Sequence, residues 1–289
     1  MLHAEAEEEP PAILVSIADA SGKVVRRMEE PATRGVHRFT WDLRAQPVTL
    51  APALPPGGGR GGRGGGGGGE AGGGDEEMMA VFGGRGGGAG ALVAPGKYTV
   101  TLARRVEGVV TPLPGSQTFD VTGEGPSTNA DRQALAEFQE KLARLQKALT
   151  ATQQAATDAG TRLTAIRRAI DATPALPFKL REETLKLERS LGEIDLALSG
   201  DRIIRAHNEG SPASISEHMQ AAQSPTRGTT GRPTRTAMEQ YQIASEGLAA
   251  EIPKLRKLLE TDIKALEKQL DAAGAPPTPG RLPDWKPGR

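Results

Sequence analysis

Apolar side chains in residues 129–173 recur at alternating steps of three and four. The positions are Leu135, Phe138, Leu142, Leu145, Leu149, Leu163, Ile166 and Ile170. The same register passes through Thr152, Ala156 and Ala159, so the stripe narrows there without breaking. This spacing is a heptad seam and predicts a helix over 129–172, ended by Pro174. Because a helix with one apolar stripe is not stable alone in water, it needs partner helices.

Two later segments repeat the pattern. Residues 178–198 place apolar or small side chains at Leu180, Thr184, Leu187, Leu191, Ile194 and Leu198. Residues 234–273 do so at Met238, Tyr241, Leu248, Ile252, Leu255, Leu259, Ile263, Leu266 and Leu270. Pro253 lies inside the last segment and predicts a kink there. Between the second and third segments, one short helix is expected at residues 214–223. We therefore expect a long antiparallel three-helix, coiled-coil-like bundle over 126–275, followed by a Pro-rich tail, 276–289.

The N-terminal third carries β-strand patterns instead. The strand-like segments are 12–18, 23–28, 35–43, 94–103 and 117–122. In the third of them, Phe39, Trp41 and Leu43 share one face, which we assign to the core. In the fourth, Tyr98, Val100 and Leu102 point to one side. Short strands separated by Gly and Pro predict a small Ig-like β-sandwich over residues 12–125, so the fold class is α+β and multidomain.

Residues 56–91 form a Gly-rich, low-complexity insert in this sandwich. Such a segment buries too little apolar surface to offset its chain entropy, so we expect disorder there and in residues 1–11. Arg60, Arg63 and Arg85 lie among glycines, as in RNA-binding arginine–glycine segments. Acidic side chains nearby offset them, which favours a flexible loop: Glu70, Asp75, Glu76 and Glu77.

Composition narrows the classes of partner. Lys+Arg 36 balances Asp+Glu 36, so charge gives no reason to expect nucleic acid or an anionic membrane as the main partner. The count of Cys is 0, which excludes disulfides and thiolate metal sites. The sequence has no apolar run long enough to span a membrane, and the acidic N-terminus lacks the apolar core of a signal peptide. Neither observation identifies the compartment.

No catalytic, cofactor-binding or metal-binding residue is predicted. His3, His37, His207 and His218 lack metal-ligand spacing. Trp41 and Asp42 could together form a surface that binds carbohydrate. The better supported interpretation is that Trp41 lies in the core and Asp42 makes a hydrogen bond in a turn. Four glutamates lie in residues 182–193, and two of them could serve as the acid pair of a glycoside hydrolase. On a helix with a heptad seam, glutamates more often lie at solvent-exposed positions outside the seam. The four are Glu182, Glu183, Glu188 and Glu193.

Several segments resemble a known family. Val15–Arg26, Gly35–Arg44 and Leu92–Leu102 resemble the Ig-like module of flagellar hook-cap proteins. Pro233–Thr236 and the ending Gly274–Trp285 extend the resemblance through the helical part. Taken together, these segments are similar to the C-terminal region of bacterial BNR/Asp-box β-propeller proteins. Those proteins are sortilin-like and are often labelled glycosyl hydrolases. Relatives of this kind are exported.

The resemblance implies a non-catalytic accessory or interaction module. Its partner would be a β-propeller in the same or a neighbouring reading frame, and this chain would be a detached C-terminal part, since it lacks the S-x-D-x-G-x-T-W boxes of the propeller. One alternative is part of a glycoside hydrolase whose catalytic propeller is missing from this chain. A second is an RNA-binding adaptor acting through the Arg/Gly-rich loop. The heptad seams also permit the helices to associate between chains.

Overall fold

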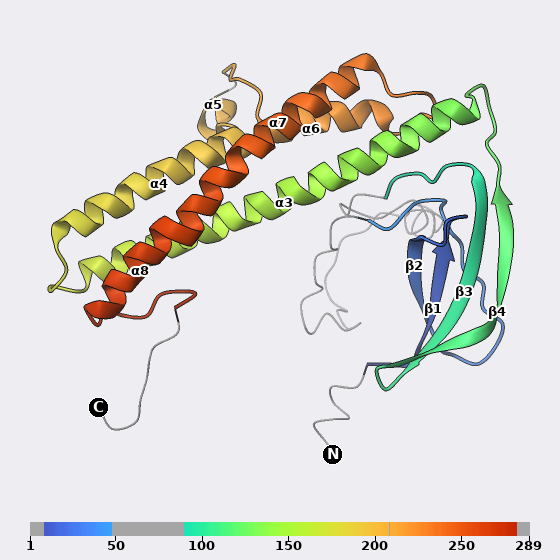
Figure 1. Ribbon diagram of the computed structural model, residues 1–289, viewed down its shortest axis with the longest axis horizontal. Coiled ribbons are helices and arrows are strands. Elements are labelled where there is room, and N and C mark those ends of the chain that lie inside the picture. The colour runs from blue at the N-terminus through green and yellow to red at the C-terminus, as the bar shows by residue number, and fades with distance from the viewer. Residues whose placement is uncertain (1–8, 48–89, 208, 282–289) are drawn as a thin grey trace, which may run out of the picture. The chain divides into compact units, whose positions relative to one another are not determined.

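The computed structural model describes residues 9–47, 90–207 and 209–281. Most of the Gly-rich insert, the first eight residues and the end of the tail lie outside the described residues. The disorder predicted for the insert and for the N-terminus therefore stays a prediction. The chain is mixed α and β, with a four-stranded antiparallel sheet and helices (Figure 1). It divides into two compact units. Unit 1 comprises residues 1–143 with 230–232, and unit 2 comprises 144–229 with 233–289.

The sheet belongs to unit 1. Its strands are β1 (Ala12–Ala18), β2 (Val24–Pro31), β3 (Gly96–Val106) and β4 (Val109–Val121), in the spatial order β2-β1-β3-β4. The predicted strand at 12–18 is confirmed residue for residue, whereas β4 begins eight positions before the predicted segment. The early start follows from the tight turn at Glu107 and Gly108, whose φ angles of 51° and 73° suit a two-residue hairpin.

The strand predicted at 35–43 is wrong, because this segment folds back on itself. His37 Nε2 lies 2.7 Å from the carbonyl oxygen of Thr33, and Trp41 Nε1 donates to the carbonyl of Arg44 at 2.9 Å. Leu43 has a φ of 57°, which is a turn conformation. Ladder pairing in this region is limited to one bridge between Arg44 and Leu92. The core assignment also fails for two of its three residues.

Phe39 and Leu43 are 38% and 39% exposed. Trp41 alone packs on the sheet, edge-on to Tyr98 and Phe119 at centroid distances of 5.5 and 6.1 Å. Among the described residues the strands form a single sheet, so the second layer of a sandwich is not made by 35–43.

The middle of one face of this sheet is apolar. Val15 pairs with Met28 on β2 and with Leu102 on β3, and Ile17 pairs with Val100. Directly paired residues point to the same side, so these side chains share a surface that we call the Val15 face. Val15 and Ile17 are 1% and 2% exposed. The Val15 face is therefore the core of the sheet, and Tyr98 marks the end of it that Trp41 covers.

The helices lie in the predicted helical segments, except for the short one at 202–206, which was not predicted. They are α3 (Asn129–Asp171), α4 (Phe178–Ser199), α5 (Arg202–Ala206), α6 (Ile215–Gln223), α7 (Arg235–Lys257) and α8 (Ile263–Ala272). A 3-10 turn, η1 (Ser224–Thr226), follows α6, and a π turn, η2 (Leu258–Asp262), joins α7 to α8. Pro253 lies inside α7, so the helix continues past it, and the helical hydrogen-bonding pattern changes at 258–262. The kink expected at Pro253 stays a prediction. None of the described helices is long and apolar enough to cross a membrane.

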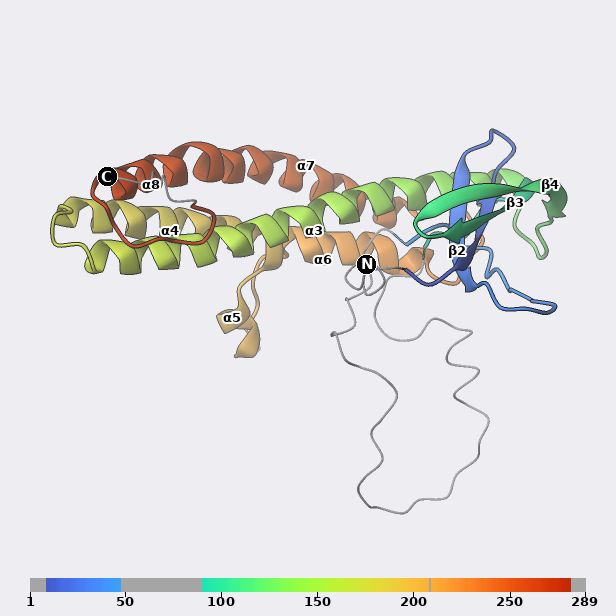
Figure 2. The same ribbon diagram turned by 90° about the horizontal axis from the view of Figure 1, so that it is seen from below.

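Side chains at the helix starts explain where the helices begin. Thr128 precedes α3, and its hydroxyl accepts from the backbone N–H of Asp131 at 3.1 Å. Ser214 and Glu217 form a reciprocal capping box at α6, and the Thr234 hydroxyl accepts from Ala237 N at α7. Figure 2 shows the segment with α5 projecting from the other helices of unit 2.

The core of unit 2 is made of heptad positions and very small residues. Leu163, Ile166, Leu180, Leu198, Ile263 and Leu270 are less than 2% exposed. Ala159, Ala222, Ala237 and Ala244 are 0% exposed. Small residues at contact positions let helix backbones approach closely, and Gly247 on α7 faces Ile215 on α6 in this way.

Candidate functional site

A pocket of about 190 Å³ opens in unit 1 where the first turns of α3 meet the end of β4. Its walls are mainly apolar and come from five separate segments of the chain. They include Leu43, Leu92, Val93, Val121, Leu135 and Ala136. The polar residue of most interest is Arg132, on the first turns of α3, and we call this hollow the Arg132 pocket.

Local hydrogen bonds hold these segments together. The bridge between Arg44 and Leu92 is flanked by bonds from Ala45 N to the carbonyl of Ala91 and from Val93 N to the carbonyl of Leu43, both at 2.8 Å. On α3, residues 132, 135, 136 and 139 lie at helical spacing, so they present one face to the pocket. The site is therefore built from secondary structure and short paired loops.

Arg132 is buried, with 9% of its surface exposed. Its Nη2 donates to the backbone carbonyl of Glu124. The guanidinium lies against the backbone of Gly123, where an added Cβ would come within 2.6 Å of Cζ. Glycine at position 123 thus leaves the room that the guanidinium occupies.

The charge of Arg132 has no counter-ion among the described residues, where no carboxylate lies within 4.0 Å of its nitrogens. The adjacent Asp131 is already used, since Arg232 Nε lies 3.2 Å from it. The Thr128 hydroxyl, which donates to Asp131 Oδ2 at 2.7 Å, lowers the pKa of that carboxyl below its usual value. Glu124 contributes its backbone to the arginine, and the residue is otherwise exposed.

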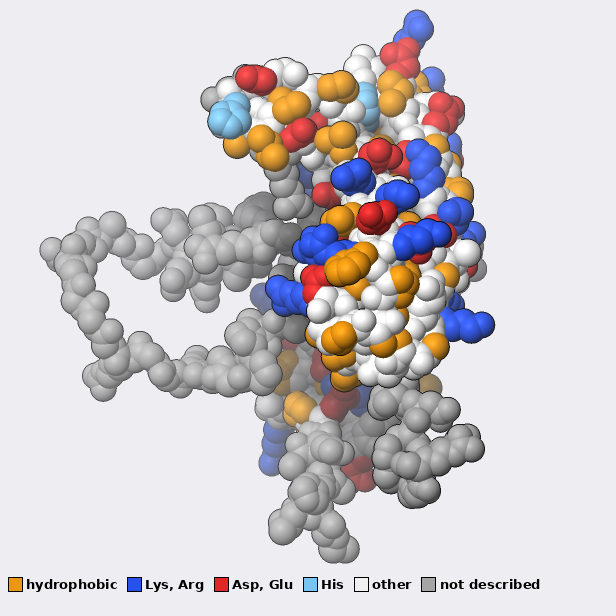
Figure 3. All heavy atoms as spheres, turned by 90° about the vertical axis from the view of Figure 1, so that its left-hand side faces the viewer, with side chains coloured by type: hydrophobic (Ala, Val, Ile, Leu, Met, Phe, Trp, Pro, Cys, Tyr) orange, Lys and Arg blue, Asp and Glu red, His pale blue; other side chains and the backbone are white. Residues whose placement is uncertain are grey.

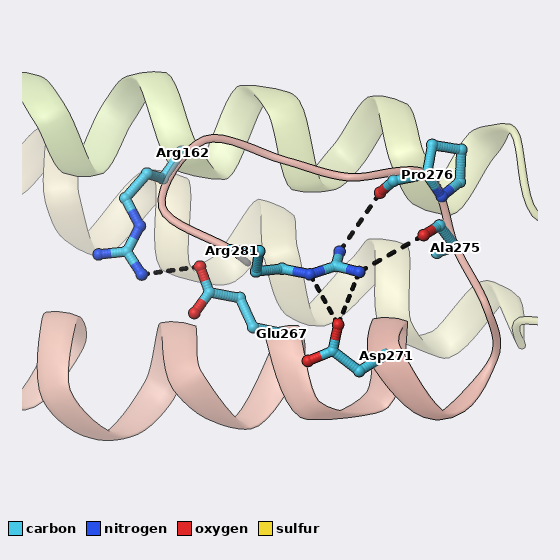
Figure 4. A network of polar contacts seen from close by, with 6 residues as sticks. All are labelled: Arg162, Glu267, Asp271, Ala275, Pro276 and Arg281. Atoms are coloured by element: carbon cyan, nitrogen blue, oxygen red, sulfur yellow. Dashed lines mark hydrogen bonds and ion pairs between the residues drawn. The ribbon is translucent and has the colours of Figure 1, made fainter. Parts of the chain in front are cut away.

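A second hollow, a groove of about 690 Å³, lies in unit 2 between α3 and residues 276–279. Figure 4 shows this segment turning back alongside α3 after α8. Arg281 Nη2 lies 2.8 Å from Asp271 Oδ1, and Arg162 Nη2 lies 2.7 Å from Glu267 Oε1. The first pair joins the segment to α8, and the second joins α3 to α8.

The α3 side of this groove carries small residues, including Gly160, Thr161, Ala165 and Ala169. Figure 3 shows hydrophobic side chains interleaved with charged ones over the helices of this end. Arg168 is the one charged residue in the lining, and it lies in the last turn of α3. The groove is therefore lined mainly by small side chains on α3, whereas the Arg132 pocket contains a buried guanidinium.

The histidines are distributed without a common centre. His37 and His207 are exposed, His218 Nδ1 lies 2.6 Å from Gln240 Oε1, and His3 lies outside the described residues. In the part of the chain that the structure describes, no group of three or more His, Asp or Glu could hold a metal ion.

Trp41 and Asp42 lie as expected for a packed aromatic side chain followed by a turn. Asp42 Oδ1 accepts from the backbone N–H of Arg44 at 3.1 Å, and Trp41 packs on two aromatic rings of the sheet. On α4, Glu188 pairs with Arg167 at 3.2 Å and Glu183 with Lys179 at 3.9 Å, while Glu182 and Glu193 are exposed. Neither of the two hollows is lined by a pair of carboxylates.

Comparison of the chain with protein-family models, curated proteins and solved structures finds no match. Function is therefore argued from the residues of the chain itself. Arg60, Arg63 and Arg85, on which an RNA-binding role would depend, lie outside the described residues.

Sequence reasoning did not identify Arg132, and the heptad pattern gives no signal for it. The alternating steps of the α3 seam, continued by four positions from Leu135 toward the N-terminus, reach Asp131, so Arg132 lies beside the seam. At such a position the pattern does not distinguish a buried charge from a solvated one.

Proposed function

We propose that the chain is a non-catalytic interaction module, an Ig-like β-sandwich followed by an antiparallel three-helix bundle, that binds a β-propeller in the same or a neighbouring reading frame. The propeller partner is supported by the resemblance of Val15–Arg26, Leu92–Leu102 and the C-terminal segment to accessory regions of such proteins. The bundle is supported by the burial of heptad positions on α3, α4 and α8, as at Leu163, Leu198 and Leu270.

The observation that carries the proposal is an exposed strip on the Val15 face, where the apolar side chains of Leu102, Val106 and Val109 lie on either side of Arg104. Leu102 is 37% exposed and Val109 is 65% exposed. Val109 pairs with Val106, which lies an even number of positions from Leu102 on β3, so the three share the face. Trp41 covers the other end of this face. A sheet whose apolar face is half covered is suited to a second layer supplied by a partner.

The strip can be tested with two neighbouring valines. Val109 lies on the Val15 face and Val110, 51% exposed and paired with Arg105, lies on the opposite face. We expect Val109→Glu to weaken binding of the purified propeller by about tenfold, since burying one valine contributes about 1.5 kcal/mol. Val110→Glu should change the affinity by less than about twofold. Binding is measured by isothermal titration calorimetry.

Equal effects of the two substitutions would show that the Val15 face is not the contact surface. A failure of the wild-type chain to bind the propeller at all would remove the proposed partner. Circular dichroism of both variants checks that each retains its sheet and helices.

A further inference from the structure

We propose that the Arg132 pocket binds a small monocarboxylic acid, with the carboxylate on the Arg132 guanidinium and an apolar group against the surrounding walls. The proposal does not depend on the propeller partner, because the pocket lies on residues other than Val109 and Leu102. It rests on three observations: the uncompensated charge, the apolar walls and the volume.

The charge favours an anion. A buried guanidinium is costly unless it is paired, and one backbone carbonyl satisfies only one of its five N–H donors. Asp131 is held by Thr128 and Arg232, and no other carboxylate of the described residues lies within pairing distance. A planar carboxylate can accept two parallel hydrogen bonds from the guanidinium.

The walls favour an apolar group on that anion. Leu43, Leu92, Val93 and Val121 come from the loops and the end of β4, and Leu135 from α3, where it is 3% exposed. Phosphate or sulfate would satisfy Arg132 but would leave these walls against a strongly hydrated ion. A carboxylate on a hydrocarbon group satisfies both parts of the pocket.

The volume limits the size of that group. A cavity of about 150 Å³ is known to hold benzene, so a pocket of about 190 Å³ suits a ring or a chain of about six carbons in addition to the carboxylate. Ligands of about nine heavy atoms reach dissociation constants on the order of 0.1–1 mM. Benzoate and hexanoate are therefore suitable probes, and benzamide and hexanamide are their uncharged counterparts.

The test is titration of the full chain with each probe, followed by amide chemical shifts in two-dimensional NMR spectra. We expect benzoate to shift the amides of Gly123, Arg132 and Leu135 in a saturable way, and to bind at least tenfold more tightly than benzamide. Arg132→Gln should weaken benzoate binding by at least tenfold and leave benzamide binding within twofold, because it removes a charge-assisted hydrogen bond.

The matched control is Arg232→Gln. Arg232 lies at the same end of α3, but its side chain is 67% exposed and is paired with Asp131. This substitution removes the same charge from the same region and should leave benzoate binding within twofold. An equal loss in both variants would mean that general electrostatic attraction, and not the pocket, holds the anion.

A second variant keeps the test decisive if Arg132→Gln does not fold. Ala136→Leu fills the pocket from α3 while Arg132 keeps its charge, and should weaken benzoate and benzamide alike by at least fivefold. Undiminished benzoate binding by folded Ala136→Leu, or absence of saturable binding by the wild-type chain, would overturn the proposal.

Discussion

Gly247 on α7 lies close to Ile215 on α6. A Cβ at this position would lie 3.0 Å from Ile215 Cγ1 and 3.3 Å from Cδ1, and Ile215 is 7% exposed. Gly247→Leu therefore forces a larger side chain into a filled contact. We expect it to lower the free energy of unfolding by about 1–3 kcal/mol, measured by urea denaturation.

Gly192 provides the matched control for this prediction. It lies within α4 and is exposed, and a Cβ added to it would have no heavy atom of a neighbouring residue within 4 Å. Gly192→Leu should raise the free energy of unfolding by about 0.5–1 kcal/mol, because leucine favours a helix over glycine. Stabilisation by both substitutions would mean that α6 and α7 are not in close contact at Gly247.

Asp19 is expected to make the stability of the sheet depend on pH. The Ser21 hydroxyl, which donates to Asp19 Oδ1 at 2.6 Å, lowers the pKa of this carboxyl below its usual value, and partial desolvation opposes the shift. Because the pKa is lower in the folded state, the stabilisation is present above the unfolded value and is lost as pH falls through the folded value. The difference in stability between wild type and Asp19→Asn should shrink over this acidic range.

The measurement is urea unfolding at a series of acidic pH values, with the pKa of Asp19 followed by carboxyl NMR. Ser21→Ala removes the hydroxyl that has the largest effect, so it should bring the pKa of Asp19 closer to that of an ordinary aspartate. A pKa of Asp19 that Ser21→Ala leaves unchanged would contradict the assignment of the shift to this hydrogen bond.

The Arg132 pocket could not be predicted from the sequence at the level of single residues. The burial of Arg132 depends on Gly123 and Glu124, at the end of β4, and on loops at 43 and 92–93 that no periodicity connects to α3. Periodicity indicates which face of a helix is apolar, but not what lies opposite its first turn. A buried charge and a solvated charge at a helix start look the same in the sequence.

At the scale of elements, long periodic helices were the most predictable part of the chain. The predicted segments at 129–172 and 178–198 match α3 and α4 to within one residue at each end, because heptad spacing and flanking prolines fix both face and ends. The failure was the strand at 35–43. Its alternation of Phe39, Trp41 and Leu43 resembled a strand, but hydrogen bonds within the segment stabilise turns that residue patterns do not reveal.

Pro253 leads to a prediction at this scale. It is exposed and lies inside α7, so it cannot donate to the carbonyl of Ala249 one turn earlier. Pro253→Ala restores that hydrogen bond without changing the core. We expect the free energy of unfolding to rise by about 1–3 kcal/mol and the melting temperature to rise by several degrees, measured by calorimetry.

Pro174→Ala is the control, because Pro174 is an exposed residue in the connection between α3 and α4. There the loss of proline only frees the unfolded chain and should lower stability by up to about 1 kcal/mol. If Pro253→Ala proved neutral or destabilising, the π turn at Leu258–Asp262 would be the better candidate for the irregularity that limits this helix.

At the scale of the whole molecule, the insert has a defined place of attachment. Residues 44 and 92 pair with each other, and hydrogen bonds join Ala45 to Ala91 and Val93 to Leu43. The described residues on either side of 48–89 are therefore close neighbours. Gln46 must be kept at this junction, since its N–H donates to the carbonyl of Val25 and its side chain accepts from Arg27 N.

Replacing residues 48–89 by Asn-Gly should accordingly preserve unit 1. Each halving of a flexible loop recovers about 0.6 kcal/mol of closure entropy, so shortening this one to a tight turn should raise stability by about 2 kcal/mol. Benzoate binding should stay within twofold, because the described lining of the Arg132 pocket comes from residues on either side of the insert and from later elements. Loss of stability would mean that the insert packs on the sheet, and a gain in benzoate affinity of tenfold or more would mean that its acidic, Met-containing stretch competes for Arg132. The same variant separates the RNA-binding alternative from the interaction module, since only the former requires Arg60, Arg63 and Arg85 for its activity.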